Sequence, residues 1–189
     1  MKALVLLFWQ MLRFKRNPED APYSAPLLLV IIAINFVLAA TAQAVGRPSQ
    51  LNIAIFSPII AIGVELLFVY LLLQLKNLNA RFIQTEISVL ACDTLLTLAA
   101  LPLLIISINL PDKSPLLGFL GLFELCLVIW GIMVRGFIYH KALNISPFLA
   151  NTLAFLLLMV SLSITVKVFP ELLAEATAAA AAAQTTPSR

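Results

Sequence analysis

The chain has 189 residues, of which 62% are hydrophobic and only 11% are charged. A soluble domain usually has about a quarter of its residues charged, so this composition argues against a water-soluble protein. The formal net charge is +3, but the basic residues are scattered between apolar blocks and form no basic stripe, which argues against a nucleic-acid partner. We therefore expect an all-α transmembrane bundle whose first partner is the lipid bilayer.

The first 16 residues predict a helix that lies in the membrane interface. Apolar residues share one side of a helical wheel, namely Leu4, Leu7, Phe8 and Met11. Polar and basic residues gather opposite, as in interfacial amphipathic helices. The run meets Arg13 and Arg16 where a secretory signal would have small residues, so we expect no cleavage. Residues 17–26 are rich in proline and should end this helix.

Five apolar blocks follow, each close to the ~20 residues that cross ~30 Å of hydrocarbon. They predict spans at 27–45, 53–75, 87–108, 116–134 and 147–168. Ser24 is the predicted cap of the first span, with Pro26 in its first turn. The connectors are short, which favours antiparallel neighbours in an up-and-down bundle over residues 27–169. The alanine-rich residues 170–189 predict a partly disordered tail.

Lysine and arginine are enriched on one side of the predicted bundle. The candidates for this cytoplasmic face are Arg13, Lys15, Arg16, Arg81, Arg135, His140 and Lys141. By the positive-inside rule the N-terminus is cytoplasmic, and an odd number of spans puts the C-terminus on the other side. The tyrosines and tryptophans, Tyr139 among them, also fall near this face. His140 is expected to be a solvated residue in a connector at 135–144.

Polar side chains within the spans are the sharpest functional signal, because an ionisable residue at mid-bilayer costs about 3 kcal/mol. The candidates are Asn35, Glu65, Asp93, Glu124 and Lys167. By depth, Glu124 is expected to face Lys167, and Asp93 to approach Arg135. Glu65 then has no charged partner and should donate a hydrogen bond to Asn35, Thr94 or a backbone carbonyl. Either these groups fix helix register, or they handle protons, ions or a solute.

Motifs for chemistry are absent from the sequence. With one histidine and two separated cysteines it offers no ligand set for zinc, haem or an iron–sulfur cluster, so we expect no metal and no cofactor. It contains neither a nucleophile elbow nor a glycine-rich phosphate loop, and we assign no catalytic residue. Gly118 and Gly121 are predicted to permit close helix packing.

The basic amphipathic start, the Pro-rich segment from Asn17 to Pro26 and the five close spans resemble bacterial members of the Yip family of small membrane proteins. Arg81-Phe82-Ile83-Gln84-Thr85, leading into Val89 to Leu104, is also similar to uncharacterised proteobacterial members. The likeness covers Phe8 to Phe169, but the DLYGP-type signature of eukaryotic relatives is absent. The resemblance implies a non-enzymatic protein of a bacterial inner membrane that binds other membrane proteins.

Three functions follow as hypotheses. The first is an accessory, scaffolding or assembly subunit of an inner-membrane complex, which associates with other subunits or with itself. The second is a small transporter component for protons, ions or a solute that uses the intramembrane carboxylates. The third is a membrane enzyme that acts on lipid, which would require polar residues converging at one interface.

Overall fold

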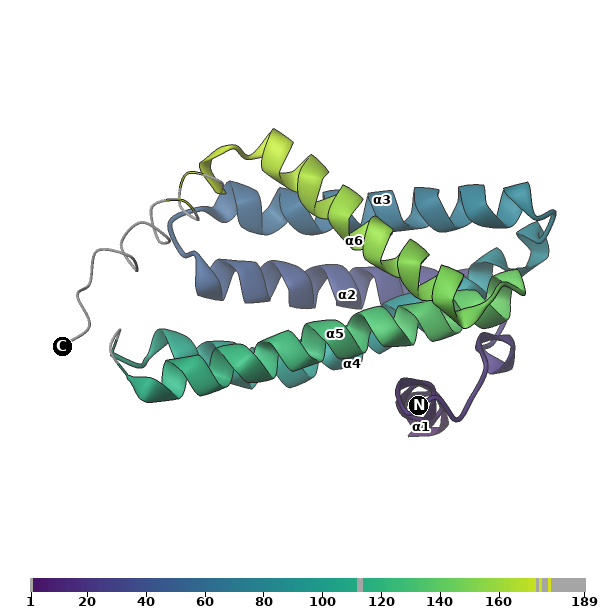
Figure 1. The fold of residues 1–189 in the computed structure, drawn as a ribbon, viewed down its shortest axis with the longest axis horizontal. Coiled ribbons are helices and arrows are strands. Elements are labelled where there is room, and N and C mark those ends of the chain that lie inside the picture. The colour runs from purple at the N-terminus through teal and green to yellow at the C-terminus, as the bar shows by residue number, and fades with distance from the viewer. Residues whose placement is uncertain (1, 112–113, 173, 175–176, 178–189) are drawn as a thin grey trace.

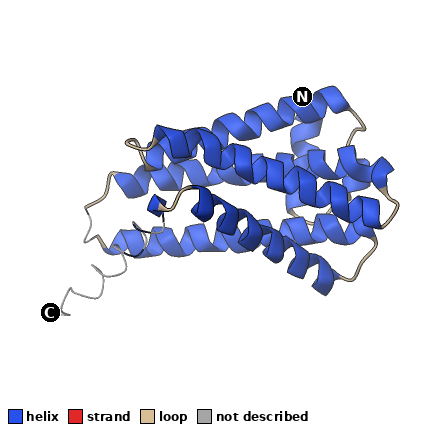
Figure 2. Cartoon of the chain, turned by 90° about the horizontal axis from the view of Figure 1, so that it is seen from above, coloured by secondary structure: helices blue, strands red, loops and turns tan. Residues whose placement is uncertain are grey.

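The structure, a computed structural model, describes residues 2–111, 114–172, 174 and 177. The described part of the chain is helical and contains no strand (Figure 2). Five of its helices are long and apolar enough to cross a membrane, which confirms the predicted fold class and number of spans. The protein is therefore an α-helical membrane protein. Most of the predicted tail at 170–189 lies outside the described residues.

Eight elements follow one another in the described residues. They are α1 (Lys2–Leu12), the 3-10 turn η1 (Pro18–Asp20), α2 (Ala25–Gly46), α3 (Leu51–Leu75), the 3-10 turn η2 (Asn79–Arg81), α4 (Phe82–Ile108), α5 (Pro115–Leu143) and α6 (Pro147–Val168). Three spanning helices begin alike, with a serine whose hydroxyl accepts a backbone N–H and a proline in the first turn: Ser24, Ser114 and Ser146. Proline has no N–H to leave unpaired there, so these starts are locally encoded.

The connector predicted at 135–144 is wrong, because α5 continues through it. The helix ends only at Asn144, which has a left-handed backbone with φ of 51°. Charged residues suggested a loop, yet Ile138 and Tyr139 are buried against the bundle and hold these turns in place. Helix α4 likewise begins at Phe82, five residues before the predicted start at 87.

The spanning helices close into a ring. Each makes its most extensive contacts with two others, in the order α2, α4, α5, α6, α3 and back to α2. Helices α2 and α4 run parallel, so the bundle departs from the simple up-and-down order that the short connectors suggested. Helix α6 crosses obliquely over α3 and α5 (Figure 1).

We call the two ends of the ring the basic end and the opposite end. The basic end holds the first residues of α2, α4 and α6 and the last residues of α3 and α5; the opposite end holds the other termini (Figure 1). Helix α1 lies across the spanning helices near the basic end, where it is seen nearly end-on in Figure 1. Its Phe8, Met11 and Leu12 are buried in the core. Part of its apolar surface therefore packs on the bundle, and the rest faces outward.

The basic end is much more densely packed than the opposite end. In α4, every residue from 85 to 92 is buried, whereas every residue from 93 to 108 is only half-buried or exposed. Two side-chain bonds fasten α1 to the middle of α5 and α4: the indole N–H of Trp130 donates to the carbonyl of Leu12 at 3.0 Å, and the thiol of Cys92 to that of Phe8 at 3.9 Å.

Close helix approach depends on a glycine other than the predicted pair. A Cβ added at Gly118 or Gly121 would meet no atom within 4 Å, so these residues do not allow a close contact. At Gly136 in α5 it would lie 3.0 Å from the Cα of Asn151 in α6 and closer still to its side-chain amide. The close approach of α5 to α6 at this point therefore depends on the missing side chain of Gly136.

Candidate functional site

A cavity of about 500 Å³ lies within the ring, and all five spanning helices contribute to its wall. Four of the five predicted intramembrane polar residues line it: Asn35, Glu65, Asp93 and Glu124. Arg135 joins them, while alanine, leucine, isoleucine and valine make up most of the remaining wall. Residues that sequence patterns placed on four different helices thus share one site.

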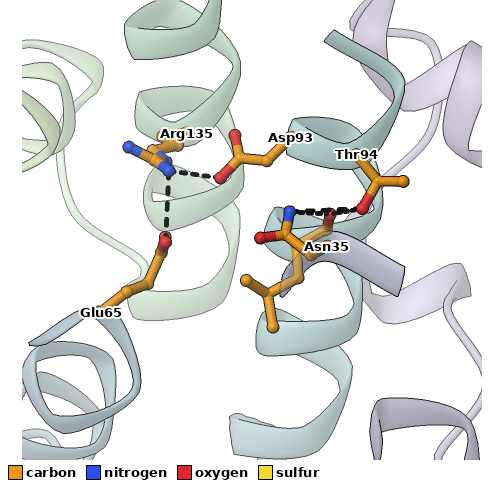
Figure 3. A network of polar contacts seen from close by, with 6 residues as sticks. Asn35, Glu65, Asp93, Thr94 and Arg135 are labelled. Carbon is orange, nitrogen blue, oxygen red and sulfur yellow. Dashed lines mark hydrogen bonds and ion pairs between the residues drawn. The ribbon is translucent and has the colours of Figure 1, made fainter. Parts of the chain in front are cut away.

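Arg135 in α5 bridges two carboxylates from two other helices (Figure 3). Its Nη2 donates to Oε2 of Glu65 in α3 at 3.2 Å and also to Oδ2 of Asp93 in α4. The expected approach of Asp93 to Arg135 is confirmed, whereas the expectation that Glu65 has no charged partner is wrong. The reason is the extension of α5, which brings Arg135 into the bundle instead of leaving it in a connector.

This ion-paired group is largely withdrawn from solvent. The side chains of Glu65, Asp93 and Arg135 are 7%, 18% and 21% exposed. Charges removed from water need partners, and a group of two carboxylates with one guanidinium is only partly neutralised. One further carboxylate, Glu124, lines the same cavity.

Asn35 binds α4 and not Glu65. Its Nδ2 donates to the carbonyl of Leu90 and to Oγ1 of Thr94, both at 3.3 Å (Figure 3). These two bonds tie α2 to α4 at the depth of the ion pairs. Asn35 was one of three hydrogen-bond partners expected for Glu65, and this alternative is wrong, because a backbone carbonyl and a hydroxyl on the adjacent helix satisfy the amide.

The expected pair between Glu124 and Lys167 is also wrong. No ion pair joins them in the part of the chain that the structure describes; Glu124 lines the cavity, while Lys167 is exposed in the last turn of α6. Matching their depths was insufficient, because depth along a helix does not fix the face on which a side chain lies.

Two buried ionisable residues were missed. Glu86 in α4 is 0% exposed and Tyr139 in α5 is 1% exposed. Both lie near enough to Glu65, Asp93 and Arg135 to interact electrostatically. Glu86 falls one residue before the predicted span at 87, and Tyr139 was assigned to the membrane surface, so neither was considered intramembrane. We call Glu65, Glu86, Asp93, Arg135 and Tyr139 the buried polar cluster.

The remaining predicted residues lie around the basic end. Arg81 at the end of η2 pairs with Glu19 of η1 at 3.0 Å and donates to the carbonyls of Lys141 and Ala142, which joins η1, η2 and α5. Arg13, Lys15 and Arg16 are exposed after α1. Their contribution is a basic surface, with Arg16 3.8 Å from Asp20.

His140 is a half-buried helical residue, which corrects its assignment to a solvated connector. Its Nδ1 contacts the carbonyl of Ile145, just beyond the end of α5. Lys141 lies with its Nζ 6.0 Å from the centre of the Phe137 ring. Among the described residues, no group of three His, Cys, Asp or Glu side chains is arranged to hold a metal ion. Cys92 and Cys126 are free thiols.

Comparison with known protein families, curated proteins and solved structures found no match to this chain. The likeness to the Yip family thus stays a prediction, and the functional argument depends on the cavity and the buried polar cluster.

Proposed function

We propose that this protein is a small transporter, or the membrane component of one, and that it binds a cationic solute in the central cavity. The observation that carries the proposal is the gathering of Glu65, Asp93 and Glu124 around one cavity with Arg135. Three carboxyl groups face one guanidinium there, so acidic groups are in excess and the cavity favours a cation over an anion. Small-molecule sites are typically apolar cavities of roughly 300–1,000 Å³ with a few convergent polar groups, as here.

The proposal includes an orientation. The basic end carries Arg13, Lys15, Arg16, Arg81 and Lys141, which supports placing it on the cytoplasmic side by the positive-inside rule. The cavity extends from the buried ion pairs toward the opposite end, so the solute would be held in the outer half of the bilayer. A bacterial inner membrane as the location rests on the resemblance to the Yip family.

The rival hypothesis is an accessory or assembly subunit, which the sequence alone favours. What shifts our preference is that register-fixing contacts need only one partner each, whereas four helices here direct polar groups toward one cavity. Isolation of the chain in mild detergent separates the two hypotheses, because an accessory subunit should come with a fixed protein partner.

Binding can be tested with two ions of the same size and shape and opposite charge. We expect the purified chain in nanodiscs to bind tetraphenylphosphonium and to bind tetraphenylborate no better than empty nanodiscs do. Glu124→Gln should weaken tetraphenylphosphonium binding by about tenfold, which corresponds to the loss of about 1.4 kcal/mol. Lys167→Gln is the matched control, because this exposed cation lies away from the cavity.

Equal binding of the two ions, or unchanged affinity in Glu124→Gln, would contradict the proposal. If neither ion binds and a stoichiometric membrane-protein partner co-purifies, the accessory role is supported instead.

A further inference from the structure

Glu86 is the least expected member of the buried polar cluster. It lies in the second turn of α4, is wholly buried, and has no hydrogen-bond partner for either carboxylate oxygen among the described residues. Burying a carboxylate without a partner costs much free energy. Packing alone therefore does not explain why Glu86 is there. A carboxyl group that takes up and gives up a proton has such a role.

Its surroundings provide a route to the cavity. Oε1 of Glu65 and the hydroxyl of Tyr139 are also buried and without hydrogen-bond partners in the described chain. Tyr139 lies within interaction range of both Glu65 and Glu86, although none of the three pairs meets hydrogen-bond geometry in this state. The path therefore requires side-chain rotation or inserted water to connect them. The charged or titratable groups that interact electrostatically with Glu86 are Glu65, Asp93, Arg135 and Tyr139.

The ionisable groups also span much of the bundle in depth. At 1.5 Å per helical residue, Glu124 and Tyr139 are about 22 Å apart along α5, and Asp93 and Glu86 are about 10 Å apart along α4. The hydrocarbon core is ~30 Å thick. From the cavity to Glu86, within two turns of the basic end, the series thus covers most of the barrier.

We propose that Glu86 is the proton acceptor at the basic end of a path that starts at Glu65 on the cavity wall and passes through Tyr139. The inference rests on the proposed function, because it couples solute binding to proton movement. A cation bound beside Asp93 and Glu65 favours the ionised form of Glu65, and the proton released moves away from the cavity. Each bound cation therefore displaces one proton toward the basic end.

The transfer balances without any further reactant. The proton leaves Oε1 of Glu65 and binds the hydroxyl oxygen of Tyr139, while the original hydroxyl proton of Tyr139 passes to a carboxylate oxygen of Glu86. Before the transfer Glu65 is a neutral acid that accepts the Arg135 hydrogen bond through Oε2, and Glu86 is a carboxylate. After it Glu65 is a carboxylate ion-paired with Arg135, and Glu86 is a neutral acid. No electron is transferred, and no covalent bond to carbon changes.

The first arm of the test needs no solute. Infrared difference spectra of the full chain in nanodiscs, recorded after a jump from high to low pH, should show a carboxylic-acid carbonyl band that Glu86→Gln removes. Tyr139→Phe should keep the band but slow its appearance by about tenfold or more. Ser88→Ala is the matched control, since Ser88 is equally buried in α4 and its hydroxyl bonds only the carbonyl of Gln84.

The second arm uses vesicles that contain a pH-sensitive dye and the reconstituted chain. Addition of tetraphenylphosphonium should change the internal pH in the wild type, because Glu86 passes its proton on to the water at the basic end. Glu86→Gln lacks the acceptor, so it should bind this cation more weakly and give no pH change. A band that survives Glu86→Gln, or that appears equally fast in Tyr139→Phe, overturns the path. If cation-dependent proton movement persists in Glu86→Gln, the path is also overturned, but the proposed cation site is not affected. A wild type that shows the Glu86 band without binding the cation refutes the proposed solute and retains the acceptor.

Discussion

Replacing Arg135 by methionine should be among the most destabilising single changes in the bundle. The guanidinium bridges Glu65 and Asp93, and all three side chains are at most 21% exposed. Removing one partner of a buried ion pair typically costs about 3–5 kcal/mol, because a charge is left without compensation. For a chain of this size 1 kcal/mol corresponds to about 2–4 °C, so the unfolding midpoint should fall by about 6–20 °C.

Thermal unfolding in one fixed detergent, followed by tryptophan fluorescence, measures this effect. The informative control is the triple variant Arg135→Met, Glu65→Gln, Asp93→Asn, which removes the two carboxylate charges together with the guanidinium. The triple variant leaves no buried charge without a partner, so it should recover more than half of the decrease. Lys167→Met removes an exposed cation and should change the midpoint by less than about 2 °C.

Two results would refute this reasoning. One is a midpoint for Arg135→Met that equals that of Lys167→Met, which would mean that the bridge contributes nothing. The other is a triple variant less stable than Arg135→Met, which would mean that hydrogen bonding and shape, and not unpaired charge, determine the loss.

Three further predictions use matched variants. Gly136→Ala should destabilise the chain by about 1–3 kcal/mol through overpacking between α5 and α6, while Gly118→Ala should be neutral or slightly stabilising in the same melts. Asn35→Leu should cost about 0.6–1.7 kcal/mol through the lost bonds to α4, whereas Thr41→Val, exposed on the same helix, should cost less than about 0.5. A topology reporter fused after Arg189 should lie on the opposite side of the membrane from one at the N-terminus, and reporters on the same side would remove a span.

The fold was predictable to the extent that single segments determine it. The lengths of the apolar segments predict five spans. Ser24 and Pro26 are a local sequence signal for the start of α2. The end of α5 was not predictable in this way, because charged residues are typical both of a loop and of a helix whose charges are paired inside a bundle. Only packing against other helices distinguishes the two, and no local pattern records it.

The candidate site was predictable in its residues but only partly in its contacts. Polarity within an apolar span identified Asn35, Glu65, Asp93 and Glu124, since solvation cost makes such residues rare. The pairing of Glu65 with Arg135 depends on how α3 and α5 rotate about their own axes, which depth does not specify. Glu86 was missed for a simpler reason: it lies at the edge of the predicted span, where a carboxylate is ordinarily solvated.

Because packing is uneven along α4, a small helix tilt about the densely packed end would produce a larger displacement at the sparsely packed end. A helix of 22 residues, such as α6, is about 33 Å long, so a tilt of about 5° at one end displaces the other by about 3 Å. Contacts with α1 and Arg81 hold the helices together toward the basic end. The sparsely packed opposite end is therefore the one expected to move. A displacement of that size equals the width of a water molecule. A tilt of this kind would change the opening at the opposite end while the bridge from Arg135 to Glu65 and Asp93 stays intact.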